Sequence, residues 1–211
     1  TVLFDLDGTL VDTAPDLIRA HNHVMKKFGY PSKSIDELRN AVGSGAKAMM
    51  AKDNGKWKWF DEKIQNEMTD EFISFYGKNI LYESTLINGV KEFLEWCKNQ
   101  DISMAVCTNK TEFLAIDLLK KIRIYDFFEY VSGYNTFEYC KPDPRHLLKT
   151  IDILDGDKSK SIMVGDSETD ANAAKAAEIP MILLKYGYTE KKSKEIYHNH
   201  LIKDFTGIEK I

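Results

Sequence analysis

The feature that most constrains this chain is an alternation, over its C-terminal half, of short apolar runs with segments whose apolar residues recur at helical spacing. This alternation predicts an α/β fold in which helices cover both faces of a doubly wound parallel sheet. Val2-Leu3-Phe4 predicts one more strand of the same sheet. The other predicted strands are residues 102–107, 128–131, 161–164 and 180–184, and the predicted helices are residues 90–97, 113–122, 144–154 and 170–177.

The segment between the first strand and this alternating part has only helical patterns. Pro15 favours the start of a helix and Gly29 its end, residues 34–37 have the form of a capping box, and residues 64–75 carry a further apolar helical face. No strand pattern stands out between residues 13 and 80. We therefore expect an all-helical cap, residues 15–81, inserted into an α/β core made of residues 1–14 and 82–211.

Polar residues follow four of the predicted strands. In a parallel sheet the carboxyl ends of the strands border the ligand crevice, so we expect these residues to lie together. Clustered carboxylates repel one another unless a cation neutralises them, and an all-oxygen ligand set indicates Mg²⁺. A metal beside a lysine suits a phosphoryl group. The four sites are Asp5 with Asp7, Thr108 with Asn109, Lys141 with Pro142, and Asp166 with Asp170.

These sites also resemble a known family. Asp5-Leu6-Asp7-Gly8-Thr9-Leu10-Val11-Asp12 resembles the D-x-D-G-T-L-x-D motif of the haloacid dehalogenase (HAD) superfamily of phosphotransferases. Cys107-Thr108-Asn109, Lys141-Pro142-Asp143-Pro144 and the segment from Gly165 to Asp170 follow in that family's order. The resemblance covers the whole chain and implies a Rossmann-like core with a helical cap inserted after the first motif.

The resemblance implies a role for each motif residue. Asp5 is expected to be the nucleophile and to form an aspartyl-phosphate, and Asp7 to act as general acid and then as base. Mg²⁺ is expected to bind the carboxylates of Asp5 and Asp166 and the backbone carbonyl of Asp7. Phosphate binding is expected from Thr108, Asn109 and Lys141, with Lys141 also catalytic; Asp170 and Thr9 are expected beside the metal ligands, Asp170 also as a carboxylate that orients Lys141.

The same resemblance narrows the reaction. Dehalogenases and phosphonate-cleaving members lack the second aspartate, so Asp7 favours phosphate ester hydrolysis. Phosphomutases retain it but usually read D-G-V, and Thr9 therefore favours a phosphatase over a β-phosphoglucomutase-like enzyme. Three further segments resemble phosphoglycolate phosphatases: Ala14-Pro15-Asp16-Leu17, Val42-Gly43-Ser44-Gly45-Ala46 and Tyr186-Gly187-Tyr188-Thr189. Pyrophosphatases and nucleotidases of the superfamily share parts of this pattern.

Substrate selection is expected to come from the cap. Gly43 and Gly45 would let its backbone approach a small carboxylate, and Lys47 or Arg39 would pair with that carboxylate. A phosphomutase and a non-catalytic phosphate-binding protein are the competing hypotheses. The presence of Asp5 and the other motif carboxylates argues against the second of these.

Composition limits the partners and the compartment. With 29 Lys and Arg against 33 Asp and Glu the net charge is -4, which argues against nucleic acid as a partner. No apolar run approaches the roughly 20 residues of a membrane span. Three cysteines without a C-x-x-C pair fit a reducing cytoplasm. We expect a cytoplasmic monomer or homodimer that binds a small phosphorylated metabolite, and a gene product that begins before Thr1 without a secretion leader.

Four remaining features have simpler interpretations than binding sites. The basic and aromatic stretch of residues 55–60 is expected to complete the cap core rather than to bind nucleic acid, and the Lys-rich residues 190–195 to form a solvated helix face. His198 and His200 lack a third metal ligand nearby, so a solvated helix end is expected there. Cys107 lies in a strand and is expected to be a buried thiol rather than a nucleophile.

Overall fold

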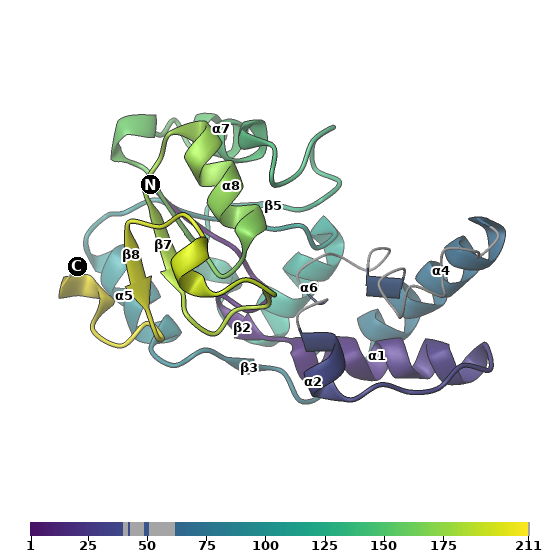
Figure 1. Cartoon of the computed structure of the whole chain (residues 1–211). Helices are drawn as coiled ribbons and strands as arrows, with labels where there is room; N and C mark the ends of the chain where they lie inside the picture. The colour runs from purple at the N-terminus through teal and green to yellow at the C-terminus, as the bar shows by residue number, and fades with distance from the viewer. Residues whose placement is uncertain (40–41, 43–48, 51–61, 211) are drawn as a thin grey trace.

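The computed structural model describes residues 1–39, 42, 49–50 and 62–210. Its main sheet has the strand order β5-β4-β1-β6-β7-β8, and every neighbouring pair is parallel (Figure 1). This confirms the predicted α/β fold. The sheet strands are β1 (Val2–Phe4), β4 (Met104–Cys107), β5 (Tyr130–Ser132), β6 (Ile162–Gly165), β7 (Met181–Leu184) and β8 (His200–Ile202).

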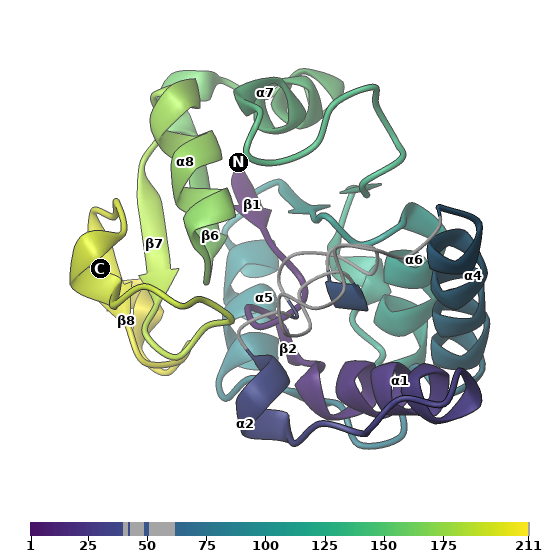
Figure 2. The same cartoon turned by 45° about the vertical axis from the view of Figure 1, so that its right-hand side comes forward.

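Helices cover both faces of this sheet. α7 and α8 pack together on one face, whereas α5 and α6 belong to the core on the other (Figures 1 and 2). Along β1 the side chains alternate between the two cores: Val2 and Phe4 face one, and Leu3 faces the other. The helices are α5 (Val90–Asn99), α6 (Glu112–Lys121), α7 (Pro144–Ile153) and α8 (Glu168–Ala177), with 3₁₀ turns η2 (Tyr125–Phe127), η3 (Lys158–Lys160), η4 (Ser193–Glu195) and η5 (Ile208–Lys210).

The predicted helical insertion lies to one side of the sheet (Figure 2). Its described helices are α1 (Ala14–Lys27), α2 (Ile35–Leu38) and α4 (Glu62–Lys78), and α1 packs along α4. The capping box at the start of α2 is present: Ser34 N donates to Glu37 Oε2 at 2.7 Å, and Glu37 N donates to Ser34 Oγ at 3.3 Å. Gly43, Gly45, Lys47 and the stretch 55–60 lie outside the described residues.

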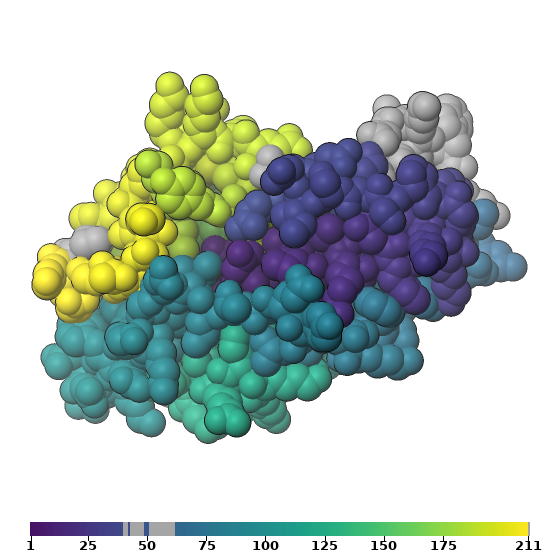
Figure 3. Space-filling view, turned by 90° about the horizontal axis from the view of Figure 1, so that it is seen from below, coloured from purple at the N-terminus to yellow at the C-terminus, as the bar shows by residue number. Residues whose placement is uncertain are grey.

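The chain leaves the sheet and returns to it through an antiparallel pair. In this pair β2 (Val11–Asp12) lies beside β3 (Thr85–Leu86). Figure 3, seen from below, shows the dark teal segment after α4 beside the purple N-terminal segment. The division into residues 1–14 and 82–211 against 15–81 stays a prediction.

The C-terminal part differs from the prediction. Residues 190–195 contain only the 3₁₀ turn η4, and His200 begins the edge strand β8 rather than ending a helix. Only Ile202 of this three-residue strand is buried, so its sequence lacks the apolar run that identifies the inner strands. Within the described residues, no helix is both long and apolar enough to cross a bilayer.

Candidate active site

The predicted site residues converge at the carboxyl end of the sheet. β1 lies between β4 and β6, so the segments after these three strands are neighbours, and the loop that carries Lys141 joins them. A cavity of about 850 Å³ opens there, with α4 of the inserted segment as part of its wall. Its described lining includes the predicted residues Asp5, Asp7, Thr108, Asn109, Lys141 and Asp170.

Lys141 joins two of the predicted carboxylates. Its Nζ lies 2.9 Å from Asp5 Oδ1 and 2.6 Å from Asp170 Oδ1, and its side chain is 1% exposed. Burial alone lowers the pKa of Lys141, but the charges of Asp170 and Asp5 outweigh burial and raise it. Lys141 is therefore a fixed positive charge. His146 accepts a hydrogen bond at Nδ1 from Lys141 N (3.2 Å), and its own pKa falls to about 3 because it is buried and faces the Lys141 charge.

Asp5, Asp166 and Asp170 form a cluster suited to a cation. One carboxylate oxygen from each lies within 4.8 Å of the others, and all three residues are buried. Burial raises the pKa of Asp5 to about 6 against the opposing effect of Lys141. Burial and the charges of Asp170 and Asp5 also raise the pKa of Asp166 well above its ordinary value. A buried all-oxygen cluster with one lysine fits a hard divalent cation.

The two oxygens of Asp170 are already committed. Oδ1 binds Lys141, and Oδ2 accepts from Ser167 Oγ at 2.7 Å and from the backbone N–H groups of Ser167 (3.1 Å) and Asp166 (3.2 Å). These bonds cap the start of α8. The contact with Lys141 fits the expected role of Asp170 as the carboxylate that orients this lysine.

Asp166 is held from two other segments. Tyr188 N donates to Asp166 Oδ2 at 2.6 Å, and Thr9 Oγ1 donates to Oδ1 at 3.3 Å. Gly8 makes room for this carboxylate: its φ is +85°, and a Cβ there would lie 2.3 Å from Asp166 Oδ2. The glycine of the first motif is therefore required both by the turn and by the neighbouring carboxylate.

The second motif contributes the side chains of Thr108 and Asn109, which have different hydrogen-bond partners. Thr108 is buried, and its Oγ1 accepts from Lys110 N at 3.2 Å, which leaves the hydroxyl proton available. Asn109 Nδ2 donates to the carbonyl oxygen of Lys141 at 2.8 Å. Asn109 therefore also ties the loop of Lys141 to the end of β4.

Asp7 is held differently from Asp5. Asp5 directly follows β1 and its N–H donates to the carbonyl oxygen of Val164 at 2.9 Å, whereas Asp7 forms an isolated bridge with Val11. Both carboxylates nevertheless reach the cavity, where Asp7 pairs with Lys110. Lys110 was not among the predicted site residues, although it directly follows Thr108 and Asn109 at the end of β4.

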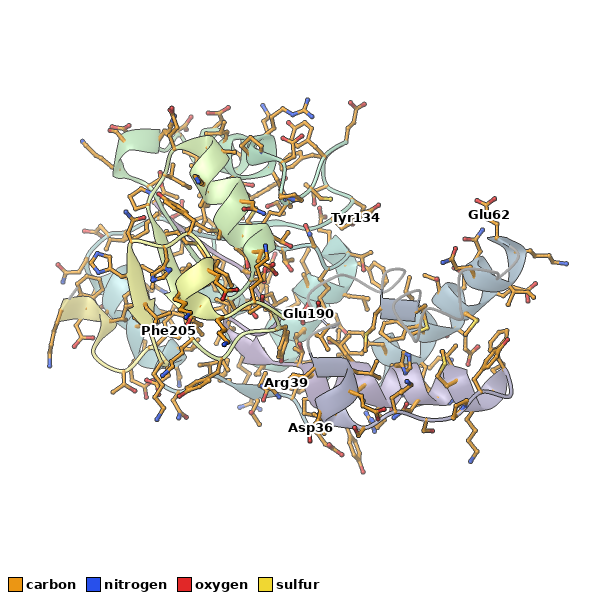
Figure 4. All side chains as sticks on the ribbon, in the orientation of Figure 1. Asp36, Arg39, Glu62, Tyr134, Glu190 and Phe205 are labelled. Atoms are coloured by element: carbon orange, nitrogen blue, oxygen red, sulfur yellow. The ribbon has the colours of Figure 1, made fainter. Side chains whose placement is uncertain are left out.

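The crossing between sheet and insertion has its own polar network. Tyr188 Oη donates to Asp12 Oδ1 at 2.6 Å and accepts from Ala14 N at 2.9 Å. Arg39, which with Lys47 is a predicted partner of the substrate carboxylate, lies 3.4 Å from Asp12 Oδ2, with its guanidinium 5.2 Å from the centre of the Tyr188 ring. In Figure 4 Arg39 lies where α2 meets the loop that carries Glu190.

A second network joins the first turn of α1 to the returning chain. The carboxylate of Asp16 is 1% exposed and accepts hydrogen bonds from the backbone N–H groups of Tyr82, Glu83 and Ser84 at 2.9–3.2 Å and from Ser84 Oγ at 2.7 Å. Arg19 NH2 adds an ion pair at 3.1 Å. Burial alone would raise the pKa of Asp16. The hydrogen bonds from the Ser84 hydroxyl and from the backbone N–H groups of residues 82–84 outweigh burial and lower this pKa.

Known proteins are similar to this chain in sequence and in fold. A phosphoglycolate phosphatase of Agrobacterium fabrum is 38% identical over 207 residues (98% of this chain, 89% of the relative), and one of Caulobacter vibrioides is 36% identical over 211 residues (100% and 89%). The crystal structure of a predicted phosphoglycolate phosphatase from Haemophilus somnus 129pt superposes with a TM-score of 0.93 at 29% identity, covering 99% of this chain and 96% of that one. Residues 2–184 match the family of haloacid dehalogenase-like hydrolases. The chain therefore belongs to the haloacid dehalogenase-like hydrolase family, as its four motifs and their geometry indicate.

Proposed function

We propose that this hydrolase is a Mg²⁺-dependent phosphatase that acts on a small phosphomonoester, 2-phosphoglycolate, through an aspartyl-phosphate. The observation that carries the proposal is the buried arrangement of Asp5, Lys141 and Asp170 beside Asp166. This arrangement supports a role for Asp5 as nucleophile, because the carboxylate lies beside the fixed positive charge of Lys141 and within a cluster of carboxylates that suits a metal ion.

The proposed reaction uses Asp5 and Asp7 in turn. A carboxylate oxygen of Asp5 attacks phosphorus, the ester P–O bond breaks, and the leaving oxygen takes a proton from Asp7. Water then attacks the phosphorus of the aspartyl-phosphate and gives a proton back to Asp7. This attack breaks the bond between Asp5 and phosphorus, so phosphate is released and the Asp5 carboxylate is restored. Lys141, 2.9 Å from Asp5 Oδ1, offsets the negative charge that the phosphoryl group brings to this carboxylate.

The remaining motif residues would bind the metal and the phosphate. Asp5, Asp166 and the backbone carbonyl of Asp7 would hold Mg²⁺, which when bound neutralises phosphate oxygens. Thr9 orients Asp166 by its hydrogen bond, and Asp170 orients Lys141. The hydroxyl of Thr108 would donate to a phosphate oxygen, with the backbone N–H groups near Asn109 beside it.

The choice of 2-phosphoglycolate follows from the relatives, and the cavity is large enough for this molecule. The two bacterial relatives carry the name phosphoglycolate phosphatase and match nearly the whole chain. A cavity of about 850 Å³ bounded by α4 suits a small metabolite. Gly43 and Gly45, with Lys47 or Arg39, stay predictions for recognition of the substrate carboxylate.

The test measures inorganic phosphate released from a panel of phosphorylated metabolites with Mg²⁺. We expect phosphoglycolate to exceed pyrophosphate, nucleoside monophosphates and hexose phosphates in kcat/KM, and EDTA to abolish release until Mg²⁺ is added. Preference for pyrophosphate or a nucleotide would overturn the substrate. Transfer of phosphate to a sugar without stoichiometric release would identify a phosphomutase.

The nucleophile is tested by substitution and trapping. Asp5→Asn is expected to lower phosphate release by about 1,000-fold or more with an unchanged circular dichroism spectrum. Asp36→Asn, at an exposed position of α2, is the matched control and should keep wild-type turnover. Radiolabel from ³²P-phosphoglycolate should appear on the peptide that contains Asp5 after acid quenching. Labelling elsewhere, or full activity of Asp5→Asn, would refute the assignment.

A further inference from the structure

A second buried lysine lies in the cavity opposite Asp7. The side chain of Lys110 is 5% exposed, and its Nζ lies 2.9 Å from Asp7 Oδ1 and 3.1 Å from Asp7 Oδ2. One ammonium group thus contacts both oxygens of one carboxylate, which restricts rotation of that carboxylate about its bond to Cβ. None of the roles assigned above requires this contact.

Lys110 is also held from the inserted segment. Its Nζ lies 4.4 Å from the centre of the ring of Tyr76, a buried residue of α4. At this distance the ring face attracts an ammonium group. Lys110 therefore lies between a carboxylate of the sheet domain and an aromatic ring of the insertion, and its position depends on both.

The two lysines of the cavity serve different carboxylates. Lys141 contacts Asp5 and Asp170, whereas Lys110 contacts Asp7. Both short contacts of Lys110 Nζ, at 2.9 and 3.1 Å, go to the two oxygens of Asp7. The contacts of Lys110 favour an action on the carboxylate over direct binding of a substrate.

We infer that Lys110 is a positioning residue that holds the Asp7 carboxylate in the orientation needed for proton transfer. The inference rests on the proposed function, in which Asp7 protonates the leaving oxygen. Lys110 itself exchanges no proton and forms no bond to the substrate. Tyr76 fixes the Lys110 side chain from α4, so the inserted helices contribute to the orientation of Asp7.

The leaving group provides the test. 4-Nitrophenolate leaves with little protonation, whereas an alkoxide requires it, so a misplaced acid harms alkyl phosphates selectively. Phosphoglycolate, ethyl phosphate and 4-nitrophenyl phosphate are compared in kcat/KM, which includes the step that breaks the ester bond. For Lys110→Met we expect a loss of about 10- to 100-fold on both alkyl phosphates and less than about 5-fold on 4-nitrophenyl phosphate.

Matched variants separate positioning from folding. Lys110→Arg keeps the charge and should recover part of the alkyl phosphate activity, and Lys110→Gln replaces the Met variant if that protein does not fold. Lys120→Met removes an exposed lysine that lies 4.8 Å from the ring of Tyr125 and should match the wild type on all three substrates. Asp7→Asn should show the same dependence on the leaving group as Lys110→Met.

Each contrary result has a distinct meaning. Equal losses on the three substrates would reduce Lys110 to a structural residue, and a loss confined to phosphoglycolate would show that it binds the substrate carboxylate; either result overturns the inference. If Asp7→Asn shows the leaving-group dependence and Lys110→Met does not, the positioning role alone fails. If the wild type hydrolyses none of the substrates, the proposed function fails first.

Discussion

The contacts of Asp16 predict a large, pH-dependent contribution to stability. Asp16→Ala removes the carboxylate that accepts hydrogen bonds from four donor groups of residues 82–84, which are three backbone N–H groups and one hydroxyl. The N–H and hydroxyl of Ser84 are buried and would lose their partner, which costs about 1–3 kcal/mol for each unpaired group. Tyr82 and Glu83 are both exposed, so their N–H groups can turn to water at little cost.

We therefore expect Asp16→Ala to lower the free energy of unfolding by about 3 kcal/mol, a large part of the 5–15 kcal/mol typical of a native protein. For a chain of this size that loss corresponds to a decrease in Tm of about 6–12 °C. Urea unfolding followed by circular dichroism measures the free energy, and thermal unfolding measures Tm. Asp36→Ala, an exposed first-turn aspartate of α2, should change stability by less than about 0.5 kcal/mol.

The pH dependence follows from the lowered pKa of Asp16. A carboxylate whose pKa is lower in the folded state stabilises the fold above its unfolded pKa of about 3.9, and this contribution disappears as the pH falls through the folded value. The difference between wild type and Asp16→Asn should thus be constant from pH 6 to pH 8 and narrow below about pH 4. A loss under about 1 kcal/mol for Asp16→Ala, or a difference that persists in acid, would refute the reasoning.

Two further comparisons use matched residues of this chain. Gly8 and Gly29 have nearly equal φ values of +85° and +80°, but of these two only Gly8 has Asp166 where a Cβ would lie. Gly29→Ala should lose about 1 kcal/mol in urea unfolding, whereas Gly8→Ala should lose more than that and should also lose phosphatase activity. Equal activity of the two variants would contradict this. Burial raises the pKa of the Cys107 thiol to about 11, so iodoacetamide at neutral pH should modify the half-buried Cys140 first, as peptide mass spectrometry can show.

The sequence predicts the inner sheet well because burial on both faces leaves a clear pattern. Residues of β1, β4, β6 and β7 are almost all buried, so each strand is a continuous apolar run. β8 has one buried residue and β2 and β3 have two residues each, which is too short for a period to be visible. Their pairing is decided by contacts between distant segments.

Site residues that directly follow a recognisable strand can be predicted from the sequence. Asp5, Thr108 and Asp166 follow apolar runs directly, and the parallel sheet brings these ends together. The partners of those residues are harder to predict, because Lys110 meets Asp7 across 103 positions and Tyr188 meets Asp12 across 176. Lys110 could have been considered from its place beside Thr108, but its partner depends on the turn after β1.

The antiparallel crossing of β2 and β3 has a consequence for how such an enzyme can evolve. Val11 lies opposite Leu86 and Asp12 opposite Thr85, so the intervening segment starts and finishes at one place on the sheet domain. A segment with adjoining ends can be lengthened, shortened or exchanged while the strands on either side stay in register, since closing a longer loop costs little more. Mutation can therefore reshape the part of the enzyme that meets new metabolites while the sheet retains the reacting groups.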